Sequence, residues 1–118
     1  MHNFRKLDIW IDSVELADIV YSLTTAFPKS EIYGLSSQMQ RSSVSVSSNI
    51  AEGSGRNSNM DFAHFLSIAL GSLFELETQV EIAHRRNYIT TENYYSLLSH
   101  IESLQKRIYN FRQHILSD

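Results

Sequence analysis

The segment between Phe62 and Leu76 constrains the fold most strongly, because its apolar residues cover most of the circumference of a helix. A helix that is apolar nearly all round has to be buried on more than one side. One chain of 118 residues has little surface left with which to cover it. The segment therefore predicts a helix inside a bundle and association between copies of the chain. The residues expected at the contact between copies are Phe62, Phe65, Leu66, Leu70, Leu73 and Phe74.

Helical periods also run through the first and last parts of the chain. Between residues 91 and 116, apolar residues recur at alternating steps of three and four, which predicts an amphipathic helix. The helix expected at residues 7–26 has two neighbouring apolar seams and ends before Pro28, because a proline disfavours helical geometry in the residue before it. The two seams consist of Trp10, Val14, Ala17 and Tyr21, and of Ile9, Leu16, Val20, Leu23 and Phe27.

The second helix is expected at residues 32–52, although its many serines are mediocre helix formers. Its apolar seam keeps the helical spacing, and small residues on a packed face allow neighbouring backbones to approach closely. Ser30 is its expected N-cap, with Glu31 in the first turn. Gly53 and Gly55 are expected to end it.

The third helix is expected at residues 59–86, where Ser58 and Asp61 resemble a capping box. No segment alternates with the period of a strand for long enough to compete with these helices. Short connections between four long helices imply antiparallel neighbours. The sequence thus predicts an all-α fold, an antiparallel up-down-up-down four-helix bundle that forms one domain over residues 1–118.

Composition and charge exclude several classes of protein. The chain has no cysteine, which excludes disulfide frameworks, thiol catalysis and cysteine-ligated zinc. Its net charge of −3 excludes a globally basic nucleic-acid binder, although a local basic patch is compatible with it. No apolar run has the length of a signal-peptide core or a membrane span, so we expect a cytoplasmic protein.

Metal chemistry is suggested by two short motifs, Glu81 with His84 and Asp61 with His64. Di-iron bundles use Glu-x-x-His pairs from two different helices. Here both pairs lie on the third helix, about 20 residues and therefore roughly 30 Å apart, so they cannot share one ion within a chain. Histidines at the surface explain them better. No Gly-x-Ser-x-Gly elbow is present either. We expect no metal, no cofactor and no catalytic residue, and therefore a protein that is not an enzyme.

Four polar residues are expected to have structural roles. Asn49 lies on the apolar seam of the second helix, where a buried amide needs hydrogen-bond partners and can set helix register. Glu52 is placed to accept hydrogen bonds from backbone N–H groups across the turn of residues 53–57. Glu75 lies on the most apolar helix, and if it is buried it should pair with a cation such as Arg41, within one chain or between copies.

The positive charges gather towards one end of the expected bundle. This end is where the first and third helices begin and the second and fourth helices end. In a ring of copies the cations there would engage phosphate groups, although ordinary solvated cations at helix ends explain the same placement. The cations concerned are Arg5, Lys6, Arg56, Lys106, Arg107 and Arg112.

Several strings occur together along the chain. They are Phe27-Pro28-x-x-Glu31-x-Tyr33-Gly34-Leu35, then Gln38, Asn49-Ile50-Ala51-Glu52-Gly53, and Gly71-Ser72-x-x-Glu75-Leu76-Glu77. In combination they resemble the bacterial four helix bundle protein family. This family includes the proteins encoded in intervening sequences of 23S ribosomal RNA genes and the accessory variability determinants of diversity-generating retroelements.

The resemblance implies a homopentameric barrel of four-helix protomers. In the retroelement branch it also implies binding to a reverse transcriptase and to nucleic acid. The members of that branch are strongly basic, whereas this chain is net acidic, which favours the generic or intervening-sequence branch.

The function expected from these observations is a non-enzymatic oligomeric adaptor or scaffold. Its expected partners are copies of itself and a nucleic acid or a nucleic-acid-processing protein such as a reverse transcriptase. One alternative is a purely structural homo-oligomer that does not touch nucleic acid. A metal-carboxylate enzyme is the less favoured alternative. No small-molecule substrate is indicated.

Overall fold

Four α-helices account for most of residues 2–117, the part of the chain that the computed structural model describes. They are α1 (Asp8–Thr24), α2 (Leu35–Ser54), α3 (Asn59–Arg85) and α4 (Thr91–Leu116), with short 3-10 helices η1 (Phe4–Lys6) and η2 (Lys29–Glu31). No strand occurs within these residues. The all-helical prediction is confirmed, and the expected starts of the third and fourth helices coincide with Asn59 and Thr91.

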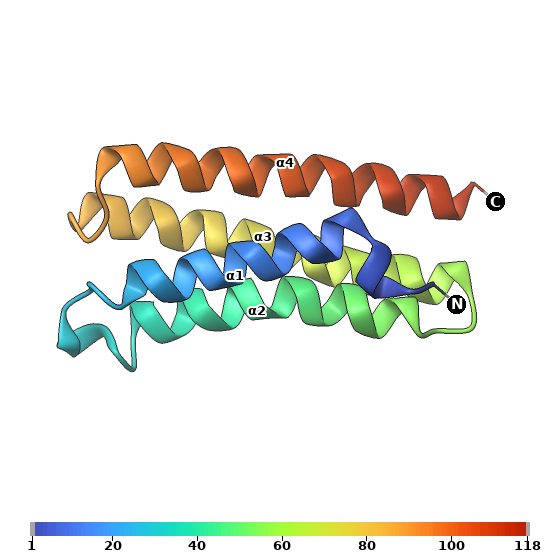
Figure 1. Cartoon of the computed structure of the whole chain (residues 1–118), viewed down its shortest axis with the longest axis horizontal. Coiled ribbons are helices and arrows are strands. Elements are labelled where there is room, and N and C mark those ends of the chain that lie inside the picture. Colours follow the sequence, from blue (N-terminus) through green and yellow to red (C-terminus); the bar gives the residue numbers. More distant parts are fainter. Residues whose placement is uncertain (1, 118) are drawn as a thin grey trace.

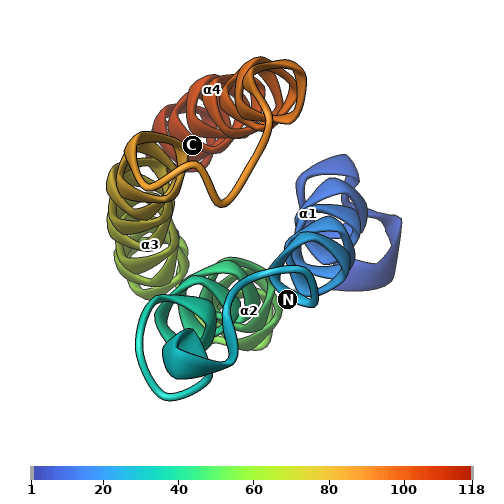
Figure 2. The ribbon, with the colours of Figure 1, turned by 90° about the vertical axis from the view of Figure 1, so that its left-hand side faces the viewer.

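The helices lie side by side along the long axis of a body that measures 46 × 23 × 20 Å. In Figure 1 the chain turns back at each connection, so that η1, the α2–α3 turn and the end of α4 gather at one end. Viewed from the other end, the helices surround a common axis in chain order (Figure 2). The first and last helices approach each other less closely than the pairs that follow one another along the chain.

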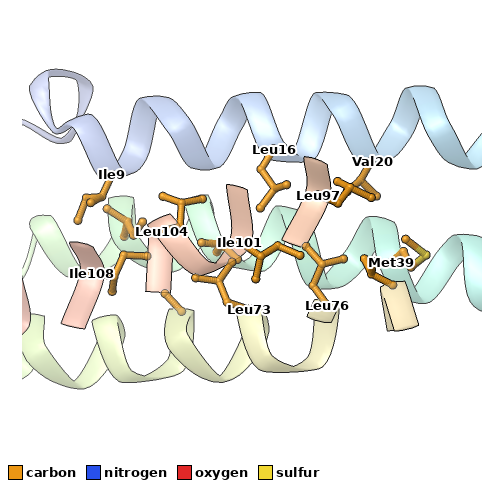
Figure 3. Close-up of a cluster of buried hydrophobic side chains, with 14 of the residues drawn as sticks. Ile9, Leu16, Val20, Met39, Leu73, Leu76, Leu97, Ile101, Leu104 and Ile108 are labelled. Atoms are coloured by element: carbon orange, nitrogen blue, oxygen red, sulfur yellow. The ribbon is translucent and has the colours of Figure 1, made fainter. Parts of the chain in front are cut away.

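The core is built from one seam of each helix (Figure 3). Leu16 of α1, Met39 of α2, Leu73 and Leu76 of α3, and Ile101 of α4 are fully buried. Of the two seams of α1, the one that contains Leu16 and Val20 faces inward. The other seam lies at the edge of the core: Val14 is 41% and Tyr21 is 48% exposed, whereas Ala17 is half-buried and Trp10 packs against the core.

The start of α2 differs from the expectation, because Ser30 lies in η2 and Gly34 is the N-cap. The carboxylate of Glu31 accepts a hydrogen bond from the Leu35 N–H at 3.1 Å and another from the Tyr88 hydroxyl at 2.9 Å. Both hydrogen bonds lower the pKa of this carboxyl, and the bond from the Leu35 N–H has the larger effect. A Cβ atom at Gly34 would lie 2.7 Å from the Glu31 carboxylate, so a larger residue there would displace this carboxylate from its present position.

Gly53 has a different role from the expected one, because it lies inside α2 and not at its end. A Cβ atom there would lie 2.7 Å from Cβ of Phe65 and 2.8 Å from the ring of Phe62. Its missing side chain therefore lets α2 and α3 pack closely, whereas Gly55 is the C-cap. Ser58 accepts a hydrogen bond from the Asp61 N–H at 3.1 Å, so the predicted cap of α3 is confirmed.

Candidate functional site

Three of the six residues predicted to join copies lie in the core of one protomer. Phe62 is 2% exposed, and Leu66 and Leu73 are fully buried, so none of them has surface to offer a second copy. The prediction is wrong for these three, because the inward side of α3 is the side that carries them. Of the others, Phe74 is 57% exposed, and Phe65 and Leu70 are half-buried.

Phe74 and Leu70 belong to a groove between α3 and α4, called here the α3–α4 groove. It has a volume of about 330 Å³. Tyr109, which is 53% exposed, lines the wall that α4 provides, and Lys106 is at the same groove. The complete lining is Leu70, Phe74, Gln105, Lys106, Tyr109 and Asn110. The outer side of α3 adds Ile68, 40% exposed, and Ile82, 46% exposed. Apolar surface thus remains on α3 after the protomer has folded.

The six cations predicted to gather at one end do not form one surface. Arg107 makes an ion pair with Asp12 of α1, whereas its neighbour Lys106 lines the α3–α4 groove on another side of α4. Both are also about 15 Å from the end of α4, at 1.5 Å per residue.

The remaining cations differ in what they contact. Arg56 pairs with Glu52 at 3.1 Å and lies over the Phe65 ring at 4.6 Å. Arg112 donates to the Ser67 hydroxyl at 2.8 Å and to the Ala63 carbonyl at 3.3 Å. Arg5 and Lys6 are exposed on η1. The Arg5 guanidinium lies 5.8 Å from the centres of the Phe4 and Trp10 rings, and neither Arg5 nor Lys6 belongs to an ion pair found within residues 2–117.

Asn49 is half-buried and joins α2 to α3 through one intermediate residue. Its amide donates to the carbonyl of Ser45 at 2.8 Å and to the Ser45 hydroxyl at 3.0 Å. The Ser72 hydroxyl of α3 donates to the same Ser45 hydroxyl at 2.8 Å. The partner observed for Glu52 is the Arg56 side chain, in place of the backbone N–H groups that were expected from the following turn.

Glu75 is exposed, which corrects the idea of a buried carboxylate on α3. Glu75 and Arg41 line a second groove of about 460 Å³ between α2 and α3, called here the α2–α3 groove. The ion pairs found within residues 2–117 include neither of them. The complete lining is Gln38, Arg41, Ser42, Ser45, Ser72, Glu75 and Gln79, all of them polar.

The motif residues Glu81 and His84 are engaged in contacts inside the protomer. The Tyr94 hydroxyl donates to the Glu81 carboxylate, and Arg85 donates to it at 2.8 Å. The His84 ring stacks on the Tyr94 ring with centroids 4.0 Å apart. Residues 2–117 contain no cluster of three or more acidic, histidine or cysteine side chains that could hold a metal ion. Within the same range, no helix is long and apolar enough to cross a membrane.

The all-helical fold with its apolar core places the chain in the class of small helical-bundle proteins. A family model described as 23S rRNA-intervening sequence protein matches residues 5–110. The chain belongs to this family, so the resemblance seen in its motifs is confirmed.

One solved relative has a closely similar fold. It is a protein of unknown function from the S23 ribosomal protein family of Bacteroides thetaiotaomicron, known from a crystal structure. It is 28% identical, with a TM-score of 0.79, and the match covers 88% of this chain and 97% of that chain. No curated protein matches this chain.

Proposed function

We propose that the protein is a non-enzymatic scaffold that assembles with copies of itself. The observation that carries this proposal is the apolar surface that α3 keeps after folding. Phe74 is 57% exposed beside the half-buried Leu70, and Tyr109 of α4 continues the same surface. Large exposed side chains that adjoin one another mark contact sites between proteins. The family resemblance sets five as the expected number of copies.

The mass of the protein in solution tests the scaffold proposal. Size-exclusion chromatography with light scattering at micromolar concentration is expected to give a molar mass that is a multiple of the 13.6 kDa of one chain. Phe74→Asp places a charge in the apolar groove, and a buried unpaired charge is strongly unfavourable, so this variant is expected to elute with a smaller mass. Ile11→Asp, a matched change at an exposed residue of α1, is expected to leave the mass unchanged.

A nucleic acid, or a protein that processes nucleic acid such as a reverse transcriptase, is the second partner we propose. Support comes from the end of the bundle where η1 packs, since the His2 N–H donates to the Ser54 carbonyl at 3.0 Å. This contact brings the exposed Arg5 and Lys6 to the same end as Arg56. In an assembly every copy adds its cations to this end, and clustered cations attract phosphate groups even on an acidic protein.

Binding of mixed-sequence RNA and DNA, measured by fluorescence anisotropy at about 50 mM salt, tests this second partner. Wild type is expected to bind with an affinity that falls steeply as salt rises, because phosphate contacts release counterions. The variant Arg5→Glu with Lys6→Glu is expected to lose most of the binding. Its control, Lys29→Glu with Arg86→Glu, makes the same charge change at the opposite end and is expected to keep it. Absence of wild-type binding would instead support a purely structural homo-oligomer.

A further inference from the structure

The α2–α3 groove has the size of a ligand site but an unusual lining. Its volume of about 460 Å³ lies within the range of about 300–1,000 Å³ that is typical of small-molecule sites. Such sites are lined mostly by apolar side chains, whereas every side chain that lines this groove is polar. A groove without an apolar wall suits a ligand that is small and polar over its whole surface.

Two opposite charges stand on the two walls of this groove at the same level. The hydrogen bond of 2.8 Å between the Ser45 and Ser72 hydroxyls fixes the register of α2 against α3. Arg41 is four residues before Ser45, and Glu75 is three residues after Ser72. Because Figure 1 shows the two helices running in opposite directions, both residues lie about 5 Å, or one turn, from the serine pair on the same side of it.

Arg41 and Glu75 do not neutralise each other within the protomer. Both are exposed, and neither belongs to an ion pair found within residues 2–117. The axes of neighbouring helices lie about 8–10 Å apart, which leaves room between the two charges for a molecule a few atoms across. A molecule with an anionic group at one end and a cationic group at the other would satisfy both walls at once.

Two further polar groups of the groove have hydrogen-bonding capacity that the protomer does not use. Oε1 of Gln79 is buried and accepts no hydrogen bond within residues 2–117, although buried polar atoms normally find partners. Gln79 is one turn beyond Glu75 on α3. The Ser45 hydroxyl accepts from the Ser72 hydroxyl and from the Asn49 amide, which leaves its own hydrogen for another acceptor. The groove thus offers a donor beside Arg41 and an acceptor beside Glu75.

We propose that the α2–α3 groove binds a small zwitterion of the amino-acid class, with a polar side chain or none. Its carboxylate pairs with the Arg41 guanidinium and accepts from the Ser45 hydroxyl. Its ammonium group pairs with the Glu75 carboxylate and donates to Oε1 of Gln79. Hydrogen bonds in which both partners are charged are stronger than neutral ones, so the two charged contacts carry the recognition. This binding goes beyond the scaffold function and does not depend on it.

A ligand-observed NMR titration tests the proposal with L-serine and L-glutamine as probes. Charge pairs exposed to solvent contribute little, so we expect dissociation constants of about 0.1–1 mM. Two blocked forms of L-glutamine are the matched probes, because the methyl ester lacks the carboxylate charge and the N-acetyl form lacks the ammonium charge. Each blocked form is expected to bind about tenfold more weakly than L-glutamine, or weaker still.

Two variants connect each charge of the ligand with one wall of the groove. Arg41→Gln and Glu75→Gln each remove one charge and keep a polar side chain, and each is expected to raise the dissociation constant for L-glutamine about tenfold or more. Arg41→Gln is expected to change binding of the methyl ester by less than about twofold, since the ester has no carboxylate for Arg41 to bind. Glu75→Gln is expected to have an equally small effect on the N-acetyl form.

The controls make the same charge changes away from the groove. Lys29→Gln and Glu15→Gln alter exposed residues that do not line it and are expected to bind both probes like wild type. Circular dichroism shows that each variant is folded. Absence of wild-type binding with either probe at about 10 mM would overturn the inference, and so would equal binding by the groove variants and wild type. A mass of one chain with intact probe binding would contradict the scaffold proposal alone.

Discussion

Leu73→Ala is expected to lower the free energy of unfolding of the protomer by about 2–5 kcal/mol, the usual cost of a cavity in a packed core. Leu73 is fully buried between the other helices (Figure 3). Phe74→Ala, at the next residue, is expected to change the same free energy by less than about 1 kcal/mol, since Phe74 is 57% exposed. Urea unfolding followed by circular dichroism measures both, at a protein concentration low enough to keep the chain monomeric.

The two substitutions are expected to act in the reverse order on assembly. Phe74→Ala removes the most exposed apolar side chain of the α3–α4 groove and should weaken the contact between copies. Any effect of Leu73→Ala on assembly should follow its effect on folding. If both substitutions lowered the free energy of unfolding equally, Phe74 would belong to the core and the assignment of the two sides of α3 would be wrong.

Gly53→Ala is expected to lower the free energy of unfolding by about 1–3 kcal/mol, the usual cost of overpacking. The added Cβ atom would lie 2.7 Å from Cβ of Phe65. This Cβ is bonded directly to the α3 backbone, so no change of rotamer can move it away. Either α2 or α3 has to move. The better helix propensity of alanine offsets part of this cost, by up to about 1 kcal/mol.

Gly71→Ala is the matched comparison, because Gly71 also lies inside a helix but a Cβ atom there meets nothing within 4 Å. This substitution is expected to raise the free energy of unfolding by about 0.5–1 kcal/mol in the monomer, as expected for glycine inside a helix. Urea midpoints of both variants, taken with the same denaturant slope, measure the difference. A stabilising effect of Gly53→Ala would show that α2 and α3 are not packed closely at that point.

The helices were predictable because each has an apolar seam with the period of 3.6 residues. The cap of α3 was predictable from Ser58, because its hydroxyl accepts a hydrogen bond from the Asp61 N–H as expected of an N-cap. The cap of α2 did not follow from Ser30. There the chain forms a tight turn, α2 begins only at Leu35, and the carboxylate of Glu31 accepts the hydrogen bond from the Leu35 N–H. A side chain within the preceding turn is a cap that the usual N-cap pattern does not anticipate.

The orientation of α3 could not be predicted from its own sequence. Its apolar residues cover most of its circumference, so periodicity alone does not distinguish the side of Leu73 from the side of Phe74. Only packing against the other three helices decides which side is buried. The first helix gave more information, since its two seams are separate: one belongs to the core, and the other is partly exposed at its edge.

The cations illustrate a second limit. Topology predicts their level along the bundle, but it does not predict the direction in which each side chain points around its helix. Arg107 and Lys106 are neighbours in sequence, and yet the former meets Asp12 of α1 while the latter lines the α3–α4 groove. Partners that lie far away in sequence, such as Asp12, become visible only when the helices are placed in space.

Sedimentation equilibrium over a thousandfold range of concentration tests most directly the central claim that α3 has one side for the core and another for a second copy. Wild type is expected to have a mass of several chains at micromolar concentration, and Phe74→Asp is expected to approach 13.6 kDa under the same conditions while it remains helical. A wild-type mass of 13.6 kDa at every concentration would contradict the claim.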